Sequence, residues 1–130
     1  MIILSIKTDQ PESEFDLFNN HQNIGHIKYL AHYDLANTIH RKIENLLKKQ
    51  NLNWSDLEAI VCFKGPGSFT GLRIGLSVAN SLAYGLNIPV IGEQGIDWQY
   101  KAINKILNGQ NDQMVIPYYG ADPNITKPRK

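Results

Sequence analysis

The order of apolar and polar residues predicts a chain that begins with strands and continues with alternating helices and strands. Residues 2–7 and 59–63 are short apolar runs, which are typical of buried strands. Residues 15–18 and 23–31 flank a short polar stretch, so they predict a hairpin. Residues 88–91 form the next apolar run. Together these segments predict a mixed sheet.

Three further segments repeat apolar residues at helical spacing. Residues 35–50 place an apolar arc opposite charged side chains, and Asp34 can cap this helix. The second segment ends near Leu86 and carries a broader apolar arc than contact with one sheet requires. Residues 96–107 form the third segment. The pattern therefore predicts an α/β domain in which helices flank the sheet.

The broad arc of the second helix contains a stripe of small residues. Gly75, Ala79 and Ala83 recur every four positions along it. Such a stripe lets another helix or a sheet approach closely. The residues alone leave two interpretations open: the stripe packs on the domain's own sheet, or it contacts a helix of a second protein.

The C-terminal end differs in character from the rest of the chain. We expect the domain to cover residues 1–112, and residues 113–130 to form a short strand, at 114–116, and then a proline-containing basic tail that ends in Lys130. The prolines exclude a regular helix in the tail. The tail is therefore either disordered or docked against a partner.

Charge and cysteine content exclude several classes of function. Thirteen basic and twelve acidic side chains leave a net charge of +1, so no broad electrostatic surface for nucleic acid is expected. The single cysteine, Cys62, lies in an apolar strand, where burial is expected. The apolar start is too short for a signal peptide, and no segment approaches membrane-spanning length. These features predict a cytoplasmic protein.

The most distinctive stretch, the signature loop, joins the strand at 59–63 to the second helix. Pro66 and Gly67 suit the second and third positions of a type II turn. Ser68 or Thr70 can cap the helix, and its first amides can bind an anion or a partner's carboxylate. The loop consists of Gly65, Pro66, Gly67, Ser68, Phe69, Thr70 and Gly71.

Two known phosphate-binding loops do not fit this stretch. A Walker loop needs Gly-Lys-Ser/Thr at the place where this chain has Thr70-Gly71-Leu72. A dinucleotide-binding fingerprint needs a glycine six positions along, counting Gly65 as the first, and the chain has Thr70 there. The alternative interpretation is that the glycines only allow a strand to turn tightly into a helix.

The continuous string from Gly65 to Gly75, with its continuation to Gly92, closely resembles the signature of the bacterial TsaB (YeaZ) family. The resemblance is strongest over residues 53–92. It implies an actin-like, ribonuclease-H-like α/β fold, here a single lobe with a mixed sheet flanked by helices. It also implies a non-catalytic scaffold subunit, without a cofactor, of the machinery that makes threonylcarbamoyladenosine in tRNA.

The resemblance also implies partners. In this family TsaB holds the catalytic subunit TsaD in a working state, and the ATPase TsaE docks on the pair. A TsaB-like chain pairs with TsaD, or with itself, through its first two helices, and contacts tRNA only indirectly. This favours the interface interpretation of the small-residue stripe. The implied interface residues are Leu72, Arg73, Gly75, Leu76, Ala79, Asn80, Ala83, Ile39 and Ile43.

Several positions argue against catalysis by this chain. In active relatives of the wider fold the first strand ends with an aspartate that handles metal and phosphate, and Lys7 stands there. A charged lysine cannot coordinate a cation. Asp9 is an alternative acid, although a local backbone cap is its favoured role. The metal-binding paralogue has two histidines on one helix, where this chain has only His40. We expect no catalytic residue and no metal site.

The remaining histidines and the length of the chain also argue against catalysis by this chain. His21, His26 and His32 have no metal-binding helical spacing and no obvious glutamate partner, which predicts surface or turn histidines. Members of the family usually have a second lobe, so ATP hydrolysis by this chain alone is not expected. The alternative function is a small nucleotide-binding ATPase or a peptidase-like enzyme of the same fold, supported by the signature loop and Asp9.

Overall fold

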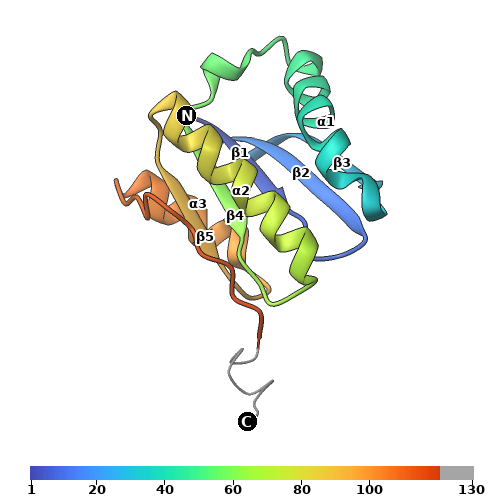
Figure 1. Ribbon diagram of the computed structural model, residues 1–130. Helices are drawn as coiled ribbons and strands as arrows, with labels where there is room; N and C mark the ends of the chain where they lie inside the picture. Colours follow the sequence, from blue (N-terminus) through green and yellow to red (C-terminus); the bar gives the residue numbers. More distant parts are fainter. Residues whose placement is uncertain (121–130) are drawn as a thin grey trace.

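Five strands form one mixed sheet, and the connections between them explain its strand directions. The computed structural model describes residues 1–120, with strands in the order β3-β2-β1-β4-β5 (Figure 1). β1, β2 and β3 are antiparallel because short turns join them, whereas β4 and β5 each follow a helix and run parallel to β1. The strands are β1 (Ile2–Lys7), β2 (Glu12–Asn19), β3 (Gln22–Leu30), β4 (Ala59–Phe63) and β5 (Val90–Glu93).

Helices cover both faces of this sheet. α1 (Leu35–Lys49) and α2 (Phe69–Leu86) lie on one face, and α3 (Trp98–Leu107) lies on the other (Figure 1). Two short 3-10 turns, η1 (His32–Asp34) and η2 (Trp54–Asp56), precede α1 and β4. The sheet is therefore the middle of three layers.

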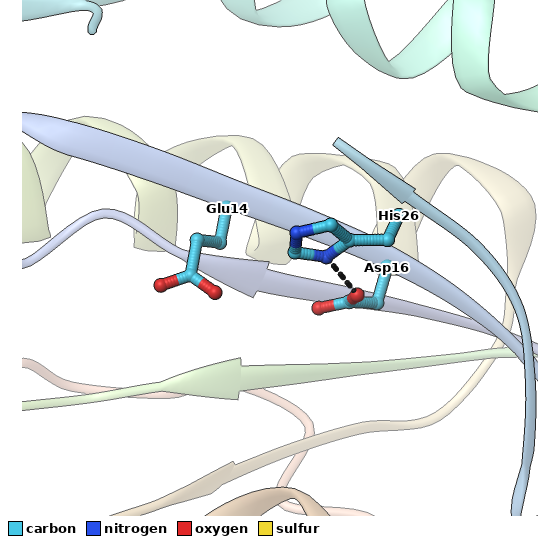
Figure 2. Close-up of side chains that lie close together, drawn as sticks. All are labelled: Glu14, Asp16 and His26. Atoms are coloured by element: carbon cyan, nitrogen blue, oxygen red, sulfur yellow. Dashed lines mark hydrogen bonds and ion pairs between the residues drawn. The ribbon is translucent and has the colours of Figure 1, made fainter. Parts of the chain in front are cut away.

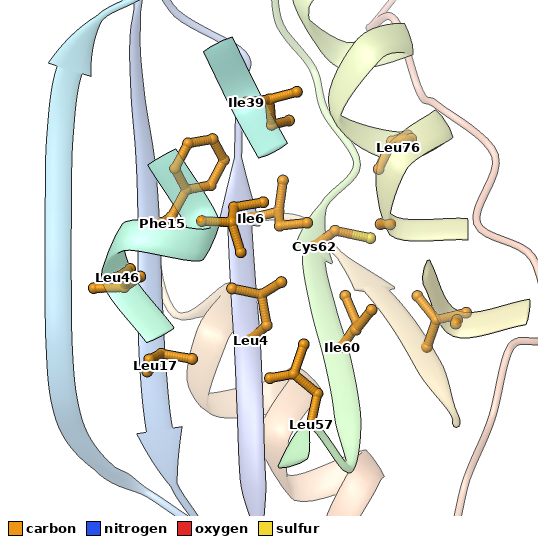
Figure 3. Packing of buried hydrophobic residues seen from close by; sticks show 14 of the residues in the cluster. Leu4, Ile6, Phe15, Leu17, Ile39, Leu46, Leu57, Ile60, Cys62 and Leu76 are labelled. Atoms are coloured by element: carbon orange, nitrogen blue, oxygen red, sulfur yellow. The ribbon is translucent and has the colours of Figure 1, made fainter. Parts of the chain in front are cut away.

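The larger core lies between the sheet and the α1–α2 layer. Figure 3 shows Leu4 and Ile6 of β1 with Ile60 and Cys62 of β4 in this core, facing helix residues such as Leu76. The predicted burial of Cys62 is confirmed, and this burial raises the pKa of its thiol. A second core packs α3 against the opposite face of the sheet. β1 and β4 are covered on both sides, which explains their nearly continuous apolar sequences.

The helices and strands predicted up to residue 107 are confirmed, with shifted ends. β2 is longer than predicted, because polar residues alternate with buried residues along it, whereas β3 keeps its predicted length and starts one residue earlier. β5 begins after Pro89, which has no N–H to donate to the sheet. Asp34 and Ser68 occupy the N-cap positions of α1 and α2, but neither side chain makes a capping hydrogen bond.

The prediction of a strand at residues 114–116 is wrong. Asp112 N still donates to the Val90 carbonyl at 2.9 Å, but Val115 is bonded to α2 instead of to the sheet. No helix or strand is formed between residues 113 and 120. The basic tail predicted beyond this segment lies outside the described residues. Within residues 1–120, no helix combines the length and the apolar character needed to cross a membrane.

Candidate functional site

The signature loop follows β4, and its conformation differs from the predicted turn. Gly65 has a positive φ of 129°, and its peptide bond to Pro66 is cis. Gly67 does not have the positive φ that a type II turn requires at its third position, so that prediction is wrong. Ser68 N donates to the Asp9 carbonyl at 2.9 Å, immediately before α2 begins.

The loop is docked on the turn that follows β1. A Cβ atom at Gly67 would overlap Asp9, and a Cβ atom at Gly71 would overlap the carbonyl oxygen of Thr8. Thr8 Oγ1 also donates to the Gly71 carbonyl at 2.8 Å. Glycine is needed at both positions because two backbone segments approach closely there. Tight packing therefore accounts for these two glycines.

The last described segment of the chain lies beside the same loop. Tyr118 N donates to the Lys64 carbonyl at 2.7 Å, and a Cβ atom at Gly65 would overlap the Tyr118 carbonyl oxygen. Asn80 of α2 bonds both backbone groups of Val115, at 3.0 and 2.8 Å. Sequence reasoning assigned Asn80 to a partner interface and missed this contact, because it joins positions 35 apart in the chain.

Most of the predicted interface residues are buried inside this chain. Gly75 faces Thr8, so the small-residue stripe of α2 packs against the chain's own sheet. Arg73 is exposed and Asn80 is half-buried. The opposite side of α2 is the exposed one. The buried members of the predicted interface are Leu72, Gly75, Leu76, Ala79, Ala83, Ile39 and Ile43.

The exposed side of α2 borders a groove that it shares with α1. Phe69 is 55% exposed, and the guanidinium of Arg73 lies 5.3 Å from the centre of its ring. The ring of Tyr119 stacks on Phe69 with 4.6 Å between centres. The groove has a volume of about 500 Å³ and is lined by Ala36, Ile39, His40, Phe69, Thr70, Arg73, Ile74, Ser77 and Val78. It presents apolar side chains next to a cation.

The residues at the end of β1 form an ion pair. Lys7 Nζ lies 2.6 Å from Asp9 Oδ1, and Asp9 is 6% exposed. Gln10 Nε2 donates to the other carboxylate oxygen at 3.3 Å. The Asp9 carboxylate thus binds side chains and not the local backbone, which corrects the favoured prediction. Lys7 balances its charge, so a metal ion at Asp9 would have to displace the lysine.

One histidine has an acidic partner that the sequence did not reveal. His26 Nδ1 lies 2.5 Å from Asp16 Oδ1, and Glu14 lies beside them (Figure 2). The predicted surface position of His26 is confirmed, but its pairing with Asp16 was not predicted. Counting back from the β2–β3 turn pairs Asp16 with Gly25, but a bulge between Leu17 and Phe18 shifts the register by one residue. That shift, which brings His26 opposite Asp16, is not visible in the hydrophobic pattern.

The other histidines are placed differently. His21 Nε2 lies 2.9 Å from Asn104 Oδ1, and its ring stacks on Tyr100. His40 lines the α1–α2 groove. The side chain of His32 lies outside the described part of the chain. The predicted surface position holds for His21, which is exposed.

The architecture defines the class of protein. A sheet ordered β3-β2-β1-β4-β5, with β2 antiparallel, two helices on one face and a third on the other, is the actin-like, ribonuclease-H-like α/β fold. The family model described as "TsaD: tRNA N6-adenosine threonylcarbamoyltransferase" matches residues 22–117. The chain belongs to this family, as a member of its TsaB (YeaZ) branch.

Individual relatives agree with this assignment. The tRNA threonylcarbamoyladenosine biosynthesis protein TsaB of Bacillus subtilis is 46% identical over 80 residues, which are 61% of this chain and 32% of that protein. A tRNA N6-adenosine threonylcarbamoyltransferase of Geotalea daltonii is 33% identical over 119 residues, 79% of this chain and 35% of that protein. YeaZ from Pseudomonas aeruginosa superposes with a TM-score of 0.66 at 25% identity, covering 72% of this chain and 43% of YeaZ. The chain thus spans about a third of the length of these curated relatives.

Proposed function

We propose that the chain is a non-catalytic subunit in tRNA threonylcarbamoyladenosine biosynthesis that binds and supports a TsaD-like catalytic subunit. The observation that carries the proposal is the exposed groove between α1 and α2, next to the signature loop, in a member of the TsaB branch. A TsaE-like ATPase would meet the chain only within the complex. The net charge of +1 supports an indirect contact with tRNA.

The exposed side of α2 suits a partner helix. Arg73, Ser77, Ser81 and Tyr84 are exposed and recur at helical spacing, so a second helix can lie along them. Arg73 lies near one end of this side, and Tyr84, which is 91% exposed, lies near the other. Arginine and tyrosine often dominate the binding energy of an interface. The buried members of the predicted interface would contribute indirectly, by holding α2 on the sheet.

The ion pair at the end of β1 supports a non-catalytic role. Active relatives use an aspartate at the position of Lys7, and here the lysine neutralises the nearby Asp9. A cation bound to this carboxylate would compete with a charge that is already 2.6 Å away. The chain's own contribution is then a surface for binding, and the chemistry belongs to the partner.

Titration calorimetry with the TsaD-like protein of the same genome tests the proposal. We expect a complex at micromolar concentration, and we expect Arg73→Glu to weaken it by a factor of about 10 or more, because Arg73 is exposed and lines the groove, and arginine is a residue type that often dominates binding energy. Lys48→Glu is the matched control, since Lys48 is exposed on α1 outside the groove. Circular dichroism confirms that both variants fold. Ala79→Arg is unsuitable, since Ala79 is fully buried.

Three outcomes distinguish the alternatives. Equal binding by the wild type and Arg73→Glu, or no complex even with TsaE and ATP added, would contradict the interface. Self-association that Arg73→Glu abolishes, without any TsaD binding, would replace the partner by a second copy of the chain. A one-to-one isotherm of the chain alone with ATP and Mg²⁺ would contradict the non-catalytic role and favour the small ATPase.

A further inference from the structure

We infer that Glu14, Asp16 and His26 form a binding site for a divalent transition-metal ion of the zinc type. One ligand atom from each side chain lies within 4.8 Å of the other two (Figure 2). The site lies on β2 and β3, on the face of the sheet opposite the α1–α2 groove. It is separate from the Lys7–Asp9 pair and independent of the proposed function.

The strand geometry places the three side chains on one face. Glu14 and Asp16 are two residues apart on β2, and side chains at that spacing point to the same side of a sheet. The bulge at Leu17 and Phe18 sets His26 directly opposite Asp16 on β3. Local backbone structure, and not a flexible loop, thus brings the groups together.

Asp16 is held in place from two other elements. Its side chain is 8% exposed, and Gln99 Nε2 of α3 donates to Oδ2 at 3.0 Å while Asn23 Nδ2 of β3 donates to Oδ1 at 3.1 Å. Gln99 also donates to Ser5 Oγ of β1 at 2.8 Å. Metal-binding carboxylates typically have hydrogen bonds of this kind, which orient them before the ion arrives. The His26 side chain is 49% exposed, which leaves a path for the ion.

The local charge also favours a dication. Lys7 and Lys28 are the residues opposite Glu14 on β1 and β3. Lys7 pairs with Asp9 at 2.6 Å and Lys28 with Glu12 at 3.7 Å, so both lysines are engaged elsewhere. Within residues 1–120, the side chain of Glu14 has neither a hydrogen bond nor an ion pair.

The ligand types select the class of ion. Two carboxylates with a neutral imidazole carry two negative charges, which a dication neutralises. Imidazole ligands suit zinc, cobalt and nickel ions, whereas magnesium and calcium prefer sites made only of oxygen. We therefore assign the site to the zinc class. Three protein ligands also leave a position for water.

Binding requires a small local change. Ligand atoms around a tetrahedral zinc ion lie about 3.4 Å apart, given bonds of about 2.1 Å. The Glu14 carboxylate must therefore turn inward by roughly 1 Å, and no polar contact holds it back. The ion takes the place of the proton between His26 and Asp16, whose atoms are now 2.5 Å apart and must separate.

Calorimetry with ZnCl₂ and visible spectroscopy with CoCl₂ on the full chain test this assignment. We expect one ion per chain and cobalt d–d bands of a nitrogen–oxygen site. Glu14→Gln should weaken binding by a factor of about 10 or more, since it removes one charged ligand. His26→Gln should abolish the cobalt bands. Both side chains are partly exposed, so we expect both variants to fold.

Matched controls make the test decisive. Glu44→Gln alters a carboxylate on α1, on the other face of the sheet, and should leave binding unchanged. His21→Gln removes another exposed histidine and should also have no effect. The assignment is overturned if the wild type binds neither ion at millimolar concentration. It is equally overturned if Glu14→Gln and His26→Gln bind as the wild type does, or if His21→Gln abolishes binding.

Discussion

Gly67 lies where the signature loop crosses the turn after β1, and its lack of a side chain is a structural requirement. A Cβ atom there would overlap Asp9 Cβ and approach the Asp9 backbone, which cannot move without disturbing β1. We therefore expect Gly67→Ala to lower the free energy of unfolding by about 1–3 kcal/mol. Urea denaturation monitored by circular dichroism measures this change.

Gly85 provides the matched control at the same scale. It lies on the exposed side of α2, and nothing stands within 4 Å of a Cβ atom built there. Gly85→Ala should raise the free energy of unfolding by about 0.5–1 kcal/mol, because alanine favours the helix. If both substitutions have the same effect, the close approach at Gly67 does not control the stability of the loop.

At the scale of elements, ion pairs between Glu93 of β5 and two lysines of α3 connect the helix to the strand. Lys105 bonds the Glu93 carboxylate directly, and Lys101 lies 3.8 Å from it. Partial burial by itself would raise the pKa of Glu93, but the hydrogen bond and charge of Lys105, with help from Gln94 and Lys101, lower it below the ordinary 4.5. The same hydrogen bond raises the pKa of Lys105 above the ordinary 10.5.

These directions fix the pH range in which the pair stabilises the fold. The lowered pKa of Glu93 means that its contribution is present above the unfolded-state value of 4.5 and is lost as the pH falls through the folded-state value. The raised pKa of Lys105 means that its contribution is present below 10.5 and is lost as the pH rises through the folded-state value. The pair therefore contributes across neutral pH.

Lys105→Met tests this linkage. The lysine side chain is 44% exposed, so solvent screens the pair and we expect a loss of only about 0.5–1 kcal/mol at pH 7. The difference between variant and wild type should shrink below pH 4.5, as Glu93 becomes protonated. Urea titrations at pH 7 and at acid pH measure both values. Lys101→Met, whose contact is longer, should cost less. A difference that persists unchanged in acid would contradict the role of Glu93.

At the scale of the whole molecule, Asn80 connects the C-terminal segment to the helix that follows the signature loop. Its side chain bonds the N–H and the carbonyl of Val115, which is buried. Asn80→Ala should cost about 1–3 kcal/mol, because both backbone groups lose their partner. It should also speed hydrogen exchange at the Val115 amide. Ser81→Ala, at an exposed neighbouring position, should change neither quantity. Unaltered exchange at Val115 in Asn80→Ala would show that the segment is held by other contacts.

The element order was predictable because each element carries its own local signal. The apolar runs at β1 and β4, the arc of α1 and the polar turn between β2 and β3 all depend on neighbouring residues only. Some failures are local, namely the type II turn and the N-caps of α1 and α2, but the others are long-range. The hydrophobic pattern marked α2 as broadly apolar, but could not tell which apolar residues face the sheet and which face solvent. Residues 114–116 resemble a strand, yet a helix side chain binds the backbone of Val115.

The sequence by itself determined the family, the order of the elements, the burial of Cys62 and the place of the signature loop, because these depend on local periodicity and on a continuous string of residues. Tertiary structure alone decided which side of α2 is exposed, how the loop glycines pack on Thr8 and Asp9, and that His26 meets Asp16. The physical reason is that each of these contacts joins different elements, and a one-residue bulge or a helix rotation is enough to change the partner without altering the local pattern.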